Sequence, residues 1–214
     1  MKPLGILGGT FDPIHHGHLR PAQEIQHVLE LAEILVIPAF LPPHRDPPVA
    51  TAEQRLRMAE LAVAGLPGFR VDDREIRRRG PSYTVLTLES LREEHGERSL
   101  CLLLGMDAFQ GLESWHQWKR LPILSNFIVV TRPGWAVPVA DDLPSWARDR
   151  LAHSPDELAQ SPAGRIFFQP VTPQDISATS IRAAIASGKP VDNMLPPAVL
   201  DFIHSHKIYH SRNH

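Results

Sequence analysis

The sequence predicts an α/β fold with a doubly wound, mostly parallel sheet and helices on both faces. Short apolar runs alternate with amphipathic segments along the 214 residues, which is the pattern that strand–helix–strand units leave in a sequence. The run SLCLLLG at 99–105 has no polar alternation, so both faces of the sheet should be covered. We predict a single domain over 1–214, with a peripheral irregular segment at about 133–163 that is rich in Pro, Asp and Ser.

The first elements are justified by periodicity. The apolar residues at 4–7 predict a strand, and apolar residues at helical spacing predict a helix over 18–31. The run EILVIP at 33–38 predicts a second strand. The proline-rich stretch after it is predicted to be a loop, because proline interrupts both strand and helix hydrogen bonding.

The middle of the chain opens with a capping signal. Thr51 and Gln54 are three residues apart, as in a capping box, and the apolar residues after them predict a helix that ends at Gly65. The run FRVDDREI at 69–76 is the third predicted strand. Another amphipathic helix is expected over 83–96.

The second half repeats the alternation. After the strand at 99–105, apolar runs at 126–132 and 165–171 predict two more strands. Two helices close the chain, one at 179–187 before a glycine and one at 197–205. The alternation of strands and helices therefore continues through the strand at 165–171 and the helix at 179–187, as a doubly wound sheet requires.

Composition excludes several classes of protein. The formal net charge of −2 gives no electrostatic footprint for nucleic acid. No apolar stretch is long enough to span a membrane, and the N-terminus lacks the pattern of a signal peptide. The single cysteine, Cys101, lies in an apolar run and is expected to be buried. One cysteine cannot form an internal disulfide, which fits a reducing compartment, so we expect a cytoplasmic protein. From the charge and the apolar stretches we expect no nucleic-acid or membrane partner.

Polar residues follow the strands where a ligand would bind. In doubly wound sheets, ligands bind beyond the carboxyl ends of the strands. The segments in that place contain histidines, arginines, hydroxyl groups and glycines, which together predict a site for an anion. They are GGTFDPIHHGH (8–18), PAFLPPHR (38–45), GMDAFQGLESWHQW (105–118) and VTPQDISATSIR (171–182).

The glycines of the first segment favour close approach to a ligand. Gly8 and Gly9 let the backbone come near it, and Gly17 removes a side chain where a helix begins, whose amides favour phosphate. The segment fits neither G-x-G-x-x-G nor the phosphate loop that ends in Lys-Ser/Thr. His15 and His18 are three residues apart with no glutamate between them, unlike the H-E-x-x-H of a zinc site. We predict no protein-bound metal.

Two signatures resemble those of a known family. GGTFDPIHHGH resembles the H-x-G-H signature of the nucleotidyltransferase superfamily, and ISATSIR at 176–182 resembles its I-S-S-T-x-I-R signature. Ala178 stands where the pattern usually has serine, but its neighbours match. PPHR, PSYTVLTLE, GMDAF and SWHQW are similar to motifs of the bacterial nicotinate-nucleotide adenylyltransferases, so the resemblance covers nearly the whole chain and implies a Rossmann-like fold.

The resemblance implies an adenylyl transfer between ATP and nicotinate mononucleotide in NAD biosynthesis, with release of pyrophosphate. The nucleophile is already an anion, so the site must mainly position the phosphates and neutralise their charge. His15, His18 and Arg182 would be catalytic as phosphate donors, and Mg²⁺ would be held with the ATP phosphates. The implied ATP-binding residues are Gly8, Gly9, Thr10, Phe11, His15, His18, Gly105, Asp107, Ser177, Thr179 and Arg182.

A second set of residues is assigned to the mononucleotide. His44 and Arg45 would suit its phosphate, and Trp115 could stack on its ring. Ser82, Tyr83 and Thr84 could cap a helix, whose amides would also bind a carboxylate. Asp107 would accept ribose hydroxyls or act as a structural cap.

Other polar residues have plainer interpretations. Asp12 is interpreted as a turn residue before Pro13, His16 as a solvent-facing neighbour, and Trp118 as a packing residue. Four histidines near the C-terminus are expected to be exposed and without a role: His204, His206, His210 and His214.

Two alternative functions remain open at this point. One is a sister adenylyl- or cytidylyltransferase such as the pantetheine-phosphate enzyme, against which the chain length and the segment around Trp115 argue. The other is a non-catalytic nucleotide sensor on the same fold, which the intact His15, His18 and Arg182 disfavour. The oligomeric state is not predicted.

Overall fold

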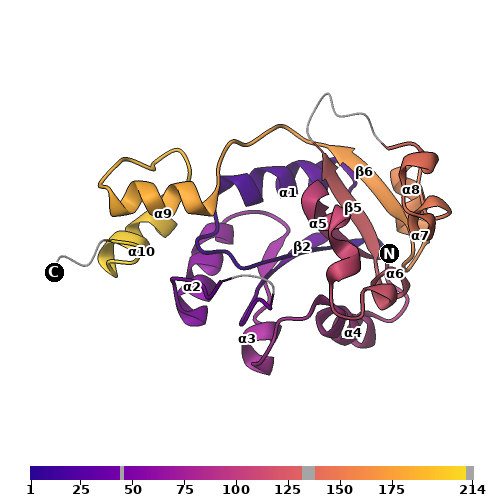
Figure 1. Ribbon diagram of the computed structural model, residues 1–214, viewed down its shortest axis with the longest axis horizontal. Helices are drawn as coiled ribbons and strands as arrows, with labels where there is room; N and C mark the ends of the chain where they lie inside the picture. Colours follow the sequence, from indigo (N-terminus) through magenta and orange to yellow (C-terminus); the bar gives the residue numbers. More distant parts are fainter. Residues whose placement is uncertain (44–45, 132–137, 211–214) are drawn as a thin grey trace. The chain divides into compact units, whose positions relative to one another are not determined.

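Six strands form one sheet in the computed structural model (Figure 1), with the order β3-β2-β1-β4-β5-β6. The order runs outward in both directions from β1 and β4, as expected for a doubly wound sheet, and the pairs β1–β4, β4–β5 and β5–β6 are parallel. The predicted fold class is therefore confirmed. The strands are β1 (Leu4–Gly9), β2 (Glu33–Pro38), β3 (Phe69–Val71), β4 (Leu100–Gly105), β5 (Asn126–Thr131) and β6 (Ile166–Pro170).

Helices and helical turns connect the strands. The structure describes residues 1–43, 46–131 and 138–210. Within these residues the helical elements are α1 (His16–Val28), α2 (Ala52–Val63), α3 (Arg74–Arg78), α4 (Thr84–His95), α5 (Met106–Gln110), η1 (Leu112–Ser114), η2 (Trp118–Arg120), α6 (Leu121–Leu124), η3 (Ala140–Asp142), α7 (Ser145–Arg148), α8 (Pro155–Gln160), α9 (Ala178–Ala186) and α10 (Pro197–Ser205).

The chain divides into two compact units, each of which is described by itself. Unit 1 comprises Met1–Gly8, Pro21–Leu35 and Tyr83–Pro173. Unit 2 comprises Gly9–Arg20, Val36–Ser82 and Gln174–His214. The single domain over 1–214 stays a prediction.

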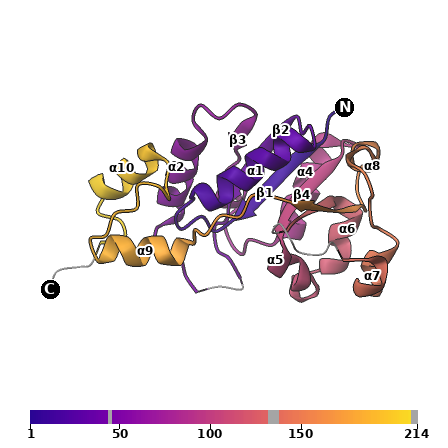
Figure 2. The same ribbon diagram turned by 90° about the horizontal axis from the view of Figure 1, so that it is seen from above.

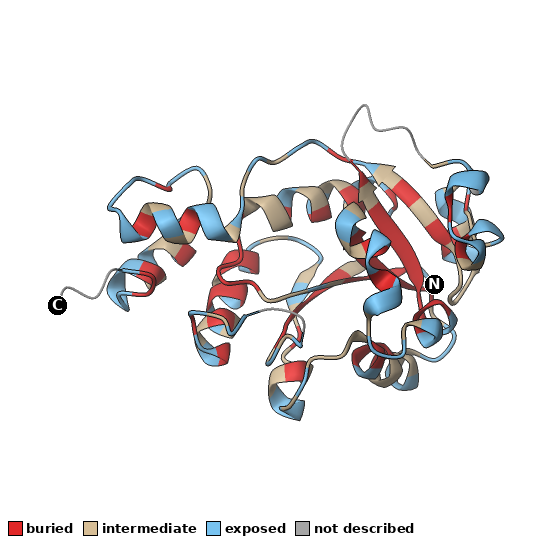
Figure 3. Ribbon diagram, viewed as in Figure 1, coloured by how far each residue is buried: buried red, intermediate tan, exposed pale blue. Residues whose placement is uncertain are grey.

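Unit 1 contains two strands that are buried over most of their length. β4 is buried from Leu100 to Leu104, and β5 is buried over most of its length, as Figure 3 shows. Such strands need cover on both faces. Cys101 on β4 is fully buried, as predicted, and burial raises the pKa of its thiol to about 11.

Unit 2 has a helical part formed by segments far apart in the sequence. α9 and α10 lie side by side in both views (Figures 1 and 2), and α10 packs against α2. The apolar side chains of Val199 and Ile203 on α10 are fully buried. α2 begins at the predicted capping box, since Thr51 Oγ1 accepts from Gln54 N and Gln54 Oε1 accepts from Thr51 N.

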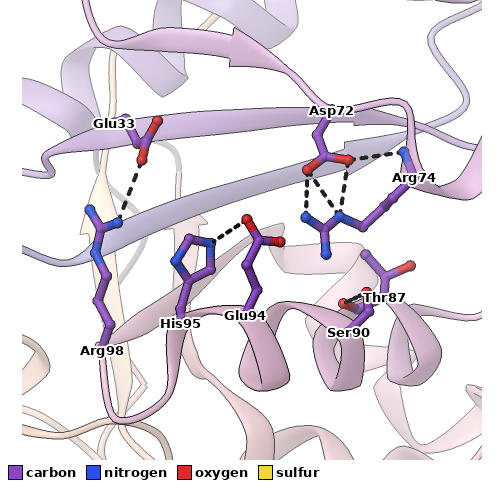
Figure 4. A network of polar contacts seen from close by, with 8 residues as sticks. All are labelled: Glu33, Asp72, Arg74, Thr87, Ser90, Glu94, His95 and Arg98. Carbon is purple, nitrogen blue, oxygen red and sulfur yellow. Dashed lines mark hydrogen bonds and ion pairs between the residues drawn. The ribbon is translucent and has the colours of Figure 1, made fainter.

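The third strand is shorter than predicted. β3 ends at Val71, and α3 follows where the sequence predicted strand up to residue 76. The Asp72 carboxylate accepts from the main-chain N–H of Arg74 at 2.9 Å and from its guanidinium (Figure 4). Such a local bond replaces the strand ladder and turns the chain, which explains the difference.

Short helices follow β4, in a segment for which the sequence predicted no helix or strand. α5, η1, η2 and α6 are each too short to show a helical repeat. Aromatic contacts stabilise this part of unit 1. The ring centroid of Trp146 lies 5.7 Å from that of Phe109 and 5.5 Å from that of Trp118. Trp118 is therefore a packing residue, as expected.

The segment at about 133–163 contains η3, α7 and α8 in its described part. Leu143, Ala147 and Leu158 are buried there, which gives these short helices an apolar side within unit 1. Among the described residues, no helix is long and apolar enough to cross a membrane.

Candidate active site

The loop after β1 is shaped by Phe11. Phe11 is buried and has a φ of 52°, in the left-handed region that L-residues rarely adopt. Its ring packs edge-on to His18, with the ring centroids 5.1 Å apart. A Cβ added at Gly9 would lie 2.7 Å from the Phe11 ring. Glycine is therefore required at position 9 by this close approach rather than by its own backbone angles.

His15 and His18 form a pair at the start of α1. Their ring centroids are 3.7 Å apart, and His15 N donates to His18 Nδ1 at 3.3 Å. Because Nδ1 of His18 accepts a hydrogen bond, the neutral ring carries its proton on Nε2. His18 is half-buried.

His15 is held neutral by its surroundings. Its side chain is 4% exposed, and within the described part of the chain its Nδ1 has no hydrogen-bond partner. Burial, with a smaller contribution from His16, lowers the pKa of His15 to about 4. At neutral pH the ring is therefore uncharged, with one N–H donor and one acceptor.

The lowered pKa of His15 predicts a pH-dependent stability. Between its folded pKa of about 4 and the unfolded value of about 6.5, the unfolded chain binds more protons at this residue, so stability present above pH 6.5 is lost as the pH falls. We expect His15 to remove about 2 kcal/mol of unfolding free energy between pH 7.5 and 5. Urea unfolding of His15→Gln should show this pH-dependent loss reduced by that amount.

The control for this prediction is His27→Gln, which removes an exposed histidine from the same helix. This variant should lose as much unfolding free energy between pH 7.5 and 5 as the wild type does. If His15→Gln and the wild type lose the same unfolding free energy over this pH range, protonation of His15 does not contribute to the pH dependence of stability.

The second signature contacts the first within unit 2. Ser177 is the N-cap of α9 and forms a capping box with Ser180. One turn further, Arg182 Nη1 donates to the main-chain oxygen of Asp12 at 2.7 Å, and Arg182 Nη2 donates to Thr179 Oγ1 at 3.3 Å. The remaining guanidinium donors can serve an anion, since the Arg182 side chain is 30% exposed.

Gly17 makes the approach of the two signatures possible. A Cβ at this position would lie 2.8 Å from His15 Nδ1 and 3.0 Å from the main-chain oxygen of Ile176. Contacts this short force one of the neighbours to move. The absence of a side chain at Gly17, which the sequence attributed to the helix start, thus serves the packing of His15 and the segment before α9.

Asp12 has a larger role than the predicted turn residue. It is 6% exposed, and its carboxylate accepts from Val49 N at 2.8 Å, Ala50 N at 3.0 Å and Tyr209 Oη at 2.7 Å. The interpretation as only a turn residue was wrong because these donors come from segments distant in the sequence. A buried carboxylate without such donors would be costly.

Arg55 is a buried arginine that the sequence interpretation missed. Its guanidinium donates to the main-chain oxygens of Thr10, Ala39, Phe40 and Ala50, and the side chain is 1% exposed. It therefore ties together the loops after β1 and β2. A signal was present, because Arg55 shares the buried stripe of α2 with Ala52, Met58, Ala59 and Ala62.

The predicted mononucleotide residues lie in both units. In unit 2, Ser82 Oγ accepts from Phe40 N at 2.8 Å, and Ser82 N donates to Leu41 O. Ser82 therefore does not cap α4. In unit 1, Tyr83 is the N-cap of α4 without a side-chain cap bond, and Thr84 is the first residue of the helix. His44 and Arg45 lie outside the described residues.

The remaining predicted residues of unit 1 lie at the ends of β1 and β4 or in and after the short helices that follow β4. Gly8 ends the unit 1 part of β1, and Gly105 ends the neighbouring parallel strand β4; both are exposed. Asp107 is exposed in the first turn of α5. Trp115 follows η1 and is half-buried, while the Tyr83 ring stacks on His116 at 4.2 Å.

The other histidines differ in exposure. His16 is half-buried, so it faces solvent only in part, and its pKa is lowered, chiefly by burial and then by Arg20. His204, His206 and His210 are exposed, as expected, and His214 lies outside the described residues. In the described part of the chain, no group of three His, Cys, Asp or Glu residues could hold a metal.

Comparisons with known proteins show a family for most of the chain. The family model described as Cytidylyltransferase-like matches residues 6–184. A protein of Methylococcus capsulatus named "Probable nicotinate-nucleotide adenylyltransferase" is 46% identical over 207 residues, 96% of this chain and 99% of the relative. One of Halorhodospira halophila with the same name is 49% identical over 199 residues, 93% of this chain and 91% of the relative.

The fold also matches a solved structure. The Plasmodium falciparum nicotinic acid mononucleotide adenylyltransferase complexed with NaAD has a TM-score of 0.73 at 17% identity, over 98% of each chain. At that identity the likeness concerns the fold. On the extent of the family model and the identity of the curated relatives, the chain belongs to the family of nicotinate-nucleotide adenylyltransferases, within the cytidylyltransferase-like enzymes.

Proposed function

We propose that this chain transfers the adenylyl group of ATP to nicotinate mononucleotide, giving nicotinate adenine dinucleotide and pyrophosphate, a step of NAD biosynthesis. The observation that carries the proposal is the contact between the two signatures, in which Arg182 binds Asp12 O and Thr179. The names of the relatives support the same substrates. The reaction needs donors to phosphate, and the signatures supply them.

The chemistry is a displacement at the α-phosphorus of ATP. A phosphate oxygen of the mononucleotide forms the new P–O bond, the bond to the β-phosphate bridging oxygen breaks, and pyrophosphate leaves with the electron pair. The attacking oxygen is already anionic, so no general base is required. The neutral His15 and the Nε2–H of His18 would donate to the α-phosphate, where charge increases in the transition state.

Arg182 and Thr179 would bind the leaving pyrophosphate. A guanidinium is a forked donor suited to phosphate oxygens, and Asp12 and Thr179 fix its direction. Ser177 starts α9, whose first amides favour negative charge. Gly8, Gly9, Thr10, Phe11, Gly105 and Asp107 complete the proposed ATP-binding set.

Mg²⁺ would enter as part of the MgATP substrate. Magnesium keeps several waters and is commonly held through substrate phosphates with few protein ligands. The proposal therefore assigns no residue of the chain as a resident metal ligand.

The nicotinate carboxylate would be recognised at the start of α4. The N-cap Tyr83 provides no side-chain cap bond, so the first amides of the helix can bind a carboxylate. Thr84 begins the helix, and Trp115 would stack on the pyridine ring. His44 and Arg45 remain proposed for the mononucleotide phosphate, and the cytoplasmic location stays a prediction.

The experiment is to measure pyrophosphate release from MgATP with nicotinate mononucleotide, nicotinamide mononucleotide and phosphopantetheine. We expect turnover with the first and a kcat/KM roughly 10- to 10⁴-fold higher than with the amide, because an NH₂ group facing amide donors leaves buried groups unpaired. Equal values for acid and amide would contradict the carboxylate assignment. Turnover with phosphopantetheine alone would indicate the sister transferase, and nucleotide binding without turnover would indicate a sensor.

A further inference from the structure

The segment after α10 reaches the loop that follows β1 through one hydroxyl group. Tyr209 Oη donates to Asp12 Oδ1 at 2.7 Å, across 197 positions of the sequence. Tyr209 is 8% exposed and has a φ of 65°, which L-residues rarely adopt. Tertiary contacts must hold such a conformation, and the bond to Asp12 is one of them.

Asp12 connects this hydroxyl to Arg182. The main-chain oxygen of Asp12 accepts from Arg182 Nη1 at 2.7 Å, and its Oδ2 lies 3.8 Å from the same atom. Val49 N donates to Oδ2 of the carboxylate, and Ala50 N donates to Oδ1. The carboxylate is thus fixed by three donors, and one of them is Tyr209.

We infer that Tyr209 is a positioning residue for the transfer reaction: its hydroxyl fixes Asp12, and Asp12 fixes the direction in which Arg182 presents its donors to the polyphosphate of ATP. The inference rests on the proposed function, in which Arg182 binds the leaving pyrophosphate. Phenylalanine would fill nearly the same volume, so packing alone does not require the hydroxyl. The buried Tyr209 hydroxyl donates to the carboxylate that also faces Arg182, so it can fix the orientation of that carboxylate.

The test compares Tyr209→Phe with the wild type in steady-state kinetics. We expect kcat/KM for ATP to fall roughly 10-fold, since a small misplacement of a binding group is costly, while KM for nicotinate mononucleotide stays unchanged. Binding of tripolyphosphate, measured by calorimetry without mononucleotide, should weaken to a similar extent. The matched control is Ile203→Val, which removes one methyl group from fully buried packing on α10 and should leave both readouts at the wild-type level.

A double-mutant cycle with Arg182→Lys separates positioning from general support. If Tyr209 acts through Asp12 on Arg182, the loss caused by Tyr209→Phe should shrink in the Arg182→Lys background. Fully additive losses, or a lower unfolding midpoint with unchanged ATP and tripolyphosphate binding, would overturn the inference. If the wild type binds tripolyphosphate but releases no pyrophosphate with any acceptor, the proposed function fails while the binding cycle still decides the role of Tyr209.

Asp12→Asn provides a second variant should Tyr209→Phe fail to fold. It keeps one carbonyl acceptor and removes the charge that faces Arg182. Weakened tripolyphosphate binding with an unchanged KM for the mononucleotide would support the inference, and unchanged tripolyphosphate binding would overturn it.

Discussion

His18→Ala is expected to remain folded and to lose about 10²- to 10³-fold in kcat, the typical effect of removing a donor that acts in the transition state. The side chain is half-buried, so its loss should cost less stability than a core substitution. Its Nδ1 accepts from His15 N–H, so the donor proposed for the α-phosphate is Nε2–H. KM for ATP should change much less than kcat, because the donor is most effective when charge builds up.

The matched control is His27→Ala, an exposed position on the same helix. It should keep wild-type turnover of ATP and nicotinate mononucleotide. A His18→Ala enzyme with near wild-type kcat would show that His18 only packs against Phe11 and His15, and the proposed chemistry would fail at its centre.

Arg55→Met is expected to lower the free energy of unfolding by more than about 3 kcal/mol. Four main-chain oxygens lose their donor, and each buried acceptor left unpaired costs about 1–3 kcal/mol. The distances to Thr10 O and Phe40 O are 2.7 and 3.0 Å, and methionine can satisfy neither. Urea unfolding at pH 7.5 would measure the loss.

Arg57→Met on the same helix is the control, since Arg57 is exposed and pairs only with Glu60 in the contacts described for it. Its unfolding free energy should change by less than about 0.5 kcal/mol. Similar losses for the two variants would mean that water replaces the Arg55 guanidinium at little cost.

The sequence predicted most elements because their signals are local. The strand at 33–38, the helix at 197–205 and the capping box at Thr51 follow from neighbouring residues, and the structure has them at those positions. The third strand was predicted too long because the Asp72–Arg74 bonds compete with the hydrogen bonds between strands. Hydrophobic periodicity does not register such a side-chain effect.

The support of the candidate site was less predictable because it is non-local. The two signatures were found by resemblance, yet Asp12, Arg55 and Tyr209 join segments that no spacing rule connects. The Arg182–Asp12 bond spans 170 positions and the Tyr209–Asp12 bond 197. Only the apolar stripe of α2 marked Arg55 as unusual.

The burial of Cys101 makes the chain carry its own reporter of sheet opening. It is the only cysteine of the 214 residues, it is fully buried on β4, and the pKa of its thiol is raised to about 11. Thiol-specific reagents react with the exposed thiolate. At neutral pH, labelling of Cys101 therefore requires β4 to separate from the neighbouring strands. The labelling rate therefore measures how often the centre of the sheet opens, and ligands that stabilise the folded chain will slow it.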